Sequence, residues 1–192
     1  MTKEIDFYFD FISPYSYLAH KKIQSLPHNI KINYMPILLG GLQNLQGVVA
    51  PAFIKPKLKH MINDCYLIAK KNKFSFTWNT KFPLNSLYIM RGNFCVNSGI
   101  KDLYIDNMFN AYWKDNLDIS NEEILNSLLE KCKITKDKFY QGIKDQKIKD
   151  ILKNITKDAF DKEIFGAPTF VVNDKIFWGQ DRLEFALKES NK

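Results

Sequence analysis

The stretch FDFISPYSYLAH joins an apolar, β-forming run to a segment whose apolar side chains recur at helical spacing. Ser13 has the chemistry of a helix N-cap, and Pro14 suits the first turn of a helix, where a missing N–H costs nothing. In one common fold, such a strand-to-helix junction carries a Cys-Pro-x-Cys pair. Here Ser13 and Ser16 occupy the two sulfur positions, so the junction keeps the proline without a thiol of its own.

Two interpretations of Ser13 follow from its position. The start of a helix has unsatisfied N–H groups and about half a positive charge, which in thiol oxidoreductases lowers the pKa of a cysteine. With serine there, the protein supplies no sulfur. Ser13 is therefore either a plain N-cap or a hydrogen-bond donor to a thiolate from another molecule. Ser16 is expected to be a packing residue of the first helical turn.

The remaining residues with redox or metal chemistry form no motif. The three cysteines are widely spaced and contain no C-x-x-C pair, which favours reduced, buried thiols and argues strongly against a thiol–disulfide oxidoreductase. The three histidines share no local metal motif, so each is expected to be a surface or helix residue, and no metal site is predicted. These histidines are His20, His28 and His60.

Composition limits the class of protein. The 192 residues are 45% hydrophobic, which is typical of a globular chain of one domain or of one domain with an insertion. The net charge of +7 comes from dispersed lysines, and no nucleic-acid-binding motif is present. The sequence has no apolar run of membrane-spanning length and no secretory signal at its start. We therefore expect a cytoplasmic protein that binds neither nucleic acid nor membrane.

The order of the predicted elements indicates the fold. After a strand at 4–9 and a helix at 14–26, the pattern predicts a second strand at 31–35. The sequence then predicts an irregular segment, a helical block of about five helices, two short strands joined by a turn at Asn173-Asp174, and a closing helix. These later segments are residues 40–56, 57–160, 167–173, 175–179 and 182–190. Within the block, Ser120 and Glu123 predict a capping box.

Without the helical block, the order βαβ–ββα remains. This is the α/β core of a thioredoxin-like fold, a four-stranded mixed sheet with helices on both faces. We therefore predict a thioredoxin-like core made of residues 1–40 and 160–192, and an inserted all-helical domain at 41–159.

Several motifs now agree with one family. The chain resembles the 2-hydroxychromene-2-carboxylate isomerase and kappa-class glutathione transferase family, within the DsbA-like branch of the thioredoxin superfamily. The motifs that carry the resemblance span most of the chain in the order of the family. They are FDFISPYSYLA at 9–19, LLGG at 38–41, PAFIKPK at 51–57, FPLN at 82–85 with Arg91, and FGAPTFVVNDKIFWGQDRLE at 165–184.

The resemblance implies that glutathione is the cofactor and that Ser13 donates a hydrogen bond to its thiolate. Pro168 is implied to be cis, with the backbone of Ala167 turned toward the cysteinyl part of glutathione. Residues alone would favour a trans bond.

The resemblance also implies contacts for the two ends of glutathione. Lys57 matches a lysine that reaches the glycine carboxylate, although as a residue it could be an ordinary surface lysine. Gln180, Asp181 and Arg182 open the last helix and are implied to hold the γ-glutamyl end, with Asp181 taking the ammonium and main-chain N–H groups of this turn taking the carboxylate. Helix capping is the alternative for Asp181, and Arg182 is either a ligand contact or a structural residue.

A further implied contact crosses a subunit boundary. Asp64 falls where the family has an acidic residue that reaches the glutathione of the neighbouring subunit, so a homodimer is implied. The alternative is a cap or ion pair within its own chain. The chain also departs from the family: Val48 replaces an asparagine and cannot donate a side-chain hydrogen bond, and His60 replaces a tyrosine.

We therefore predict a glutathione-dependent isomerase of the 2-hydroxychromene-2-carboxylate type. The substrate is an aromatic or conjugated carbonyl compound, and the thiolate is the nucleophile. A kappa-class-like glutathione transferase is the first alternative, and a non-catalytic thioredoxin-fold binding protein is the second. The substrate pocket is expected between the core and the helical block, with Tyr88, Trp113 or Phe11 as candidate lining residues.

Overall fold

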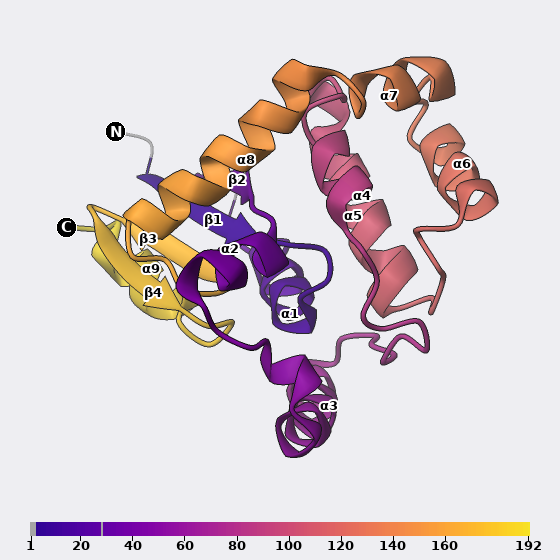
Figure 1. Ribbon diagram of the computed structural model, residues 1–192. Coiled ribbons are helices and arrows are strands. Elements are labelled where there is room, and N and C mark those ends of the chain that lie inside the picture. Colours follow the sequence, from indigo (N-terminus) through magenta and orange to yellow (C-terminus); the bar gives the residue numbers. More distant parts are fainter. Residues whose placement is uncertain (1–2, 28) are drawn as a thin grey trace.

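The computed structural model describes residues 3–27 and 29–192, and it shows a four-stranded sheet beside a group of helices (Figure 1). The chain opens with β1 (Lys3–Phe9), α1 (Pro14–Ile23) and β2 (Ile30–Pro36). Both strands agree with the prediction within one residue. The helix ends three residues before the predicted end.

The sheet has the strand order β2-β1-β3-β4. β1 is parallel to β2 and antiparallel to β3 (Thr169–Val172), and β3 is antiparallel to β4 (Lys175–Trp178). The turn between β3 and β4 places Asn173 and Asp174 at φ values of 49° and 59°. Two consecutive left-handed residues match the twist of the flanking strands, which confirms the predicted hairpin.

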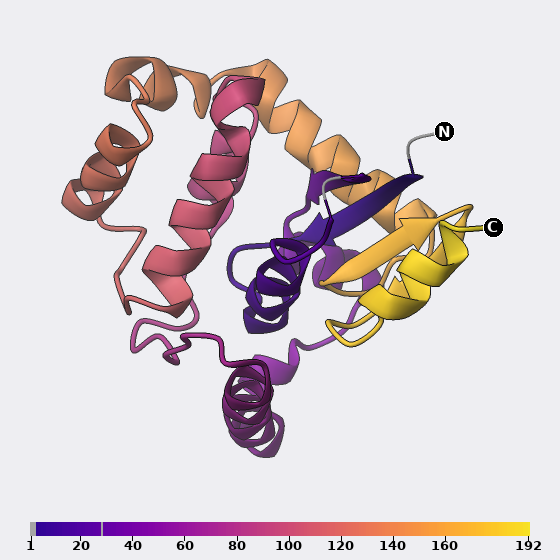
Figure 2. The same cartoon turned by 180° about the vertical axis from the view of Figure 1, so that it is seen from behind.

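The two faces of the sheet are covered by different helices (Figures 1 and 2). Phe7 and Phe9 of β1 belong to the large core beneath α1 and α9 (Leu183–Glu189). Tyr8 points to the opposite face, as strand alternation requires. There it joins a smaller cluster with Leu42 of α2 (Leu39–Gln46) and Ala159 of α8 (Gln146–Asp161). This is the thioredoxin-like arrangement that the sequence predicts.

The remaining helices lie to one side of the sheet in Figure 1. They are α3 (Lys55–Asn72), α4 (Leu87–Gly92), α5 (Ser98–Trp113), α6 (Glu122–Lys131) and α7 (Lys136–Gly142). α5 packs on α1, where the buried ring of Phe109 stacks on His20. The Trp113 indole N–H at the end of α5 donates to the carbonyl of Phe11 at 2.8 Å. The helical part is thus attached to the residues just before Ser13.

Two local predictions are wrong. Residues 40–56 are largely ordered as α2 and a short 3-10 helix, Pro51–Phe53, because the carboxylate of Asp10 accepts from the first amide of α2 across the fold. The predicted capping box at Ser120 does not form. Asn121 is the N-cap of α6, while the Ser120 hydroxyl donates to Asp118.

The boundaries of the insertion stay a prediction. α8 falls in the predicted insertion, but it packs on β2 and on α2 and supplies the second cover of the sheet. No helix in the described part of the chain is long and apolar enough to cross a membrane.

The Trp113 hydrogen bond gives a test of how the helices are attached to the core. Trp113→Phe should lower the free energy of unfolding by about 2 kcal/mol, because the buried carbonyl of Phe11 loses its partner. Urea unfolding measures the effect. Trp78→Phe is the control, since Trp78 is half-buried and its indole N–H has no hydrogen-bond partner within the described residues. Equal losses in the two variants would contradict the role of this bond.

Candidate functional site

Three segments that are far apart in sequence meet at one end of the sheet. Tyr8 of β1 pairs with Thr169 of β3, and Thr169 pairs with Trp178 of β4. The residues after β1, before β3 and after β4 therefore lie at the same end of the sheet. Two hydrogen bonds join them: the Ser13 hydroxyl donates to the carbonyl of Ala167 at 2.9 Å, and the Gly179 N–H donates to the carbonyl of Pro168 at 2.9 Å.

Ser13 is the N-cap of α1 and is almost fully buried. Its extended backbone lets the side-chain oxygen accept from the N–H of Ser16 at 3.1 Å. The same hydroxyl uses its one hydrogen on Ala167. The Ala167–Pro168 peptide is cis, as predicted. Ser16 is fully buried and its hydroxyl has no partner among the described atoms.

The electrostatics of this junction favour an anion. α1 has no acidic side chain in its first turn, so the amides and partial positive charge at its start are not neutralised there. The carboxylate that is nearest along the chain, Asp10, has both oxygens hydrogen-bonded within the chain: they accept from the N–H groups of Ile12 at 3.1 Å and Leu39 at 2.8 Å. The site can therefore hold a thiolate, which needs donors and positive potential.

Asp10 supports the junction, and the sequence prediction missed it. It is fully buried, and this burial raises the pKa of its carboxyl to about 6, while the hydrogen bonds from Leu39 and Ile12 oppose the rise. Its bonds fix the residues before Ser13 to the start of α2. The available signal was an acidic residue at the end of an apolar strand, three positions before the Ser-Pro pair.

The turn after β4 contains the three residues expected at the γ-glutamyl end. Gln180 is mostly buried, whereas Asp181 and Arg182 are exposed. Arg182 forms an ion pair with Asp181 at 3.4 Å and lies above the ring of Phe185. The turn needs Gly179, whose φ of 118° is unfavourable for other residues and where a Cβ would meet the Asp181 carboxylate.

Lys57 and Asp64 both lie on α3. Asp64 accepts a hydrogen bond from the hydroxyl of Tyr15 at 2.8 Å, which joins α3 to the first turn of α1. Lys57 is exposed and has no ion pair within the described part of the chain. No hydrogen bond or ion pair in the described part of the chain joins Lys57 to Ser13 or Ala167, so its position beside them stays a prediction.

Two of the residues expected to line a substrate pocket do not do so. Phe11 and Trp113 are fully buried, and the Trp113 ring packs against the rings of Phe76 and Trp78. Both belong to the large buried apolar core. Tyr88, in contrast, is 58% exposed and remains accessible.

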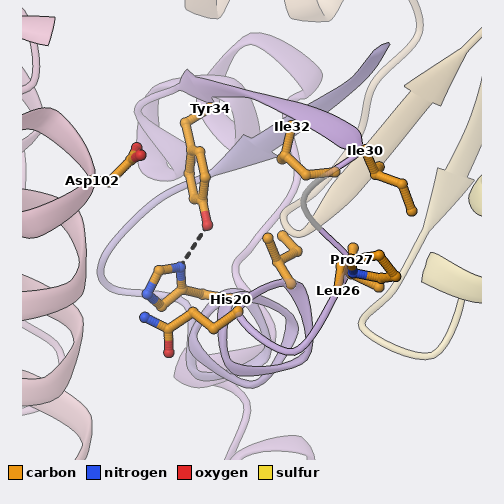
Figure 3. A pocket seen from close by; sticks show the side chains of 9 residues that line it. His20, Leu26, Pro27, Ile30, Ile32, Tyr34 and Asp102 are labelled. Atoms are coloured by element: carbon orange, nitrogen blue, oxygen red, sulfur yellow. Dashed lines mark hydrogen bonds between the residues drawn. The ribbon is translucent and has the colours of Figure 1, made fainter. Parts of the chain in front are cut away.

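A separate cavity of about 280 Å³ lies at the other end of α1 (Figure 3). His20 and Tyr34 form one wall, and their side chains are hydrogen-bonded at 2.7 Å. The other ring nitrogen of His20 lies 3.1 Å from the carboxylate of Asp106, so that nitrogen donates and Tyr34 donates to Nδ1. Burial lowers the pKa of His20. This histidine is a structural residue of α1, far along the helix from Ser13.

Of the other two histidines, the structure describes one. His60 is exposed on α3, and His28 lies outside the described residues. Across the part of the chain that the structure describes, no three histidine, cysteine or acidic side chains are grouped so that they could hold a metal. All three cysteines are free.

The fold and the junction define the class of protein. The chain belongs to the DSBA-like thioredoxin domain family, whose model matches residues 4–190. At the start of α1 the chain reads Ser13-Pro14-Tyr15-Ser16, without a cysteine.

Sequence relatives within this class are enzymes of the isomerase and glutathione transferase kind. The chain is 29% identical over 189 residues to a 2-hydroxychromene-2-carboxylate isomerase of Sphingobium xenophagum, with 96% of each chain covered. It is 26% identical over 197 residues to glutathione S-transferase kappa 1 of Caenorhabditis elegans, with 93% of this chain and 86% of the relative covered.

Solved structures support the same grouping. A 2-hydroxychromene-2-carboxylate isomerase structure superposes with a TM-score of 0.89 and 25% identity, covering 96% of this chain and 93% of that chain. The cytosolic disulfide reductase DsbM from Pseudomonas aeruginosa, solved with GSH, shares the fold at a TM-score of 0.67 and 12% identity, covering 96% and 99% of the two chains. The predicted resemblance to the isomerase and kappa transferase family is confirmed.

Asp10 predicts a pH dependence of stability. Its pKa in the folded chain, about 6, lies above the ordinary aspartate value, so the folded chain takes up a proton before the unfolded chain does. Asp10 therefore favours folding more as the pH falls from 7 to 5. Relative to Asp10→Asn, the wild-type chain should gain about 1 kcal/mol of unfolding free energy over this range. Urea titrations of both chains at pH 5 and pH 7 measure the difference. A difference that does not change with pH would contradict the assignment.

Proposed function

We propose that this protein is a glutathione-dependent isomerase of the 2-hydroxychromene-2-carboxylate type. The observation that carries the proposal is the position of Ser13, which caps α1 and contacts the carbonyl of Ala167 where a thiol–disulfide oxidoreductase has a cysteine. The sequence relatives that bear the isomerase name cover most of this chain and support the choice.

The residues of the junction fit a bound thiol. When bound, glutathione would supply a thiolate that adds reversibly to a conjugated carbonyl substrate and leaves again, so that it is not consumed. Ser13 would donate its hydroxyl hydrogen to the sulfur. The oxygen of Ser13 already accepts from Ser16, which turns the hydroxyl toward the site and leaves one hydrogen to give.

In the structure the Ser13 hydroxyl donates this hydrogen to the carbonyl of Ala167. When glutathione binds, the hydroxyl must therefore change its acceptor from this carbonyl to the sulfur. The backbone of Ala167 is the proposed contact for the cysteinyl amide of glutathione. A ligand N–H on the Ala167 carbonyl would replace the Ser13 hydroxyl there and free it for the sulfur. The hydroxyl thus changes acceptor without leaving a buried carbonyl unpaired.

The ends of glutathione would be held by charge. Lys57, which is exposed and has no ion pair within the described residues, would bind the glycine carboxylate. Asp181 would bind the γ-glutamyl ammonium, in competition with Arg182. Val48 is exposed and offers only an apolar side chain where the family has a donor, so we expect weaker peptide contacts there.

We also propose that the protein is a homodimer and is cytoplasmic. Exposed apolar side chains gather along the connection from α2 to α3, and a dimer interface would bury them. They are Leu45, Val48, Val49 and Phe53. Three free cysteines agree with a reducing compartment.

The kappa relative favours one alternative, a glutathione transferase. The same thiolate would then displace a leaving group and be consumed. Measuring free glutathione before and after full turnover of 2-hydroxychromene-2-carboxylate separates the two. An isomerase leaves the amount unchanged, whereas consumption in proportion to product would favour the transferase.

Ser13→Ala should raise the pKa of the bound glutathione thiol by about one to two pH units, because the thiolate loses a charge-assisted hydrogen bond. Thiolate absorbance, titrated against pH with glutathione bound, measures this. Ser16→Ala is the matched control, since the Ser16 hydroxyl is buried but bonded to nothing in the described chain. Equal thiol pKa values in wild-type protein and Ser13→Ala would refute the role of Ser13.

Asp64 tests the proposed dimer. Asp64→Asn removes the charge but keeps an oxygen for Tyr15, whereas Tyr15→Phe removes the bond and keeps the charge. If Asp64 reaches the ammonium of the partner's glutathione, the first variant should weaken glutathione binding by about tenfold and the second should not. Calorimetry gives the affinities, and light scattering gives the mass. A monomer, or unchanged binding by Asp64→Asn, would exclude the cross-subunit contact.

A further inference from the structure

Lys22 is a charged residue that the proposed glutathione contacts do not use. It lies in the last turn of α1 and is half-buried. Its ammonium donates to two oxygens of Gln180, the backbone carbonyl at 3.1 Å and the side-chain amide at 2.5 Å. Lys22 therefore ties the end of α1 to the turn after β4, across 158 positions of sequence.

The charge of Lys22 is not balanced by a direct contact. No carboxylate lies within ion-pair distance of its ammonium in the described chain. Burial lowers the pKa of Lys22, and the more distant carboxylates of Asp181 and Glu184 oppose this. A partly buried cation costs free energy unless a counter-charge approaches it, and a ligand carboxylate can be that counter-charge.

The neighbouring lysine shows that this arrangement is particular to Lys22. Lys21 lies on the same helix and is also partly buried, but its ammonium forms an ion pair with Asp106 of α5 at 3.3 Å. The two lysines thus differ in their partners. Lys21 is neutralised within the chain, while Lys22 contacts only neutral oxygens of the turn.

We propose that Lys22 is a positioning residue for the γ-glutamyl end of glutathione. It holds Gln180, and with it the main-chain N–H groups of the turn, in the place that receives the α-carboxylate. Its positive charge favours that carboxylate and balances Asp181, which takes the ammonium. The inference rests on the proposed function, since it names how the same site selects glutathione over shorter thiols.

The test compares two thiols on Lys22→Met. Glutathione has the γ-glutamyl group and cysteinylglycine lacks it. The variant should bind glutathione about tenfold more weakly than the wild-type protein and bind cysteinylglycine equally well, because only the former reaches the turn. In turnover, KM for glutathione should rise while kcat at saturating glutathione stays the same. Calorimetry and steady-state kinetics measure these values.

Two further variants complete the test. Lys21→Met is the matched control and should leave both affinities unchanged. Lys22→Arg keeps the charge and can still donate to Gln180, so it should recover part of the preference for glutathione. Circular dichroism and the melting temperature establish that each variant is folded.

The outcomes separate this inference from the function on which it rests. If the wild-type protein prefers glutathione and Lys22→Met keeps the same preference, the role of Lys22 is wrong and the function stands. The same holds if Lys22→Met weakens both thiols equally, since that is a general structural effect. If the wild-type protein binds neither thiol, the proposed function fails and the Lys22 inference fails with it.

Discussion

The unpaired amide groups at the start of α1 are the constraint on which the site depends. A helix cannot begin in a buried place unless these groups find acceptors. Ser13 supplies one, and its own hydrogen then requires a further acceptor, which is the carbonyl of Ala167. One hydroxyl thus joins two segments that are 154 positions apart in sequence. Together with the Gly179–Pro168 bond, it brings the three parts of the site to one end of the sheet.

The helical part of the chain holds this junction from both sides. The carbonyl of Phe11, two residues before Ser13, accepts from Trp113 of α5. The hydroxyl of Tyr15, two residues after it, donates to Asp64 of α3. Because these bonds come from α5 and α3, the strand-to-helix junction is fixed by more than the sheet and the helices that cover it. A site that binds and orients a thiol benefits from such rigid support.

Charged groups are placed unevenly around the junction. Asp10 is buried, and backbone amides donate to both of its carboxylate oxygens. Lys22 is half-buried, and its ammonium donates only to neutral oxygens. The first arrangement is complete within the chain, whereas the second has a cation without a close anion. Asp10 is therefore a group that supports the fold, whereas Lys22 is a group that is suited to a ligand.

Local sequence patterns determined much of the fold. The junction at Ser13, the strands on either side of the insertion and the turn at Asn173-Asp174 depend on residues that are close in sequence, so their types and spacing were sufficient. Residues 40–56 were predicted wrongly as irregular because the group that caps α2 comes from Asp10, which no pattern within that segment reveals.

Tertiary structure alone decided which side chains face the site. An aromatic residue carries no sign in the sequence of whether it will be enclosed, and Phe11 and Trp113 are fully buried while Tyr88 is exposed. The sequence likewise does not reveal which lysines face the site, since lysines are dispersed along the chain and alike in their chemistry. Lys22 differs from Lys21 only through its contacts across the fold, with Gln180 rather than Asp106. Such a difference arises from packing between distant segments, so the sequence determined the kind of site, and the folded chain determined which charges belong to it.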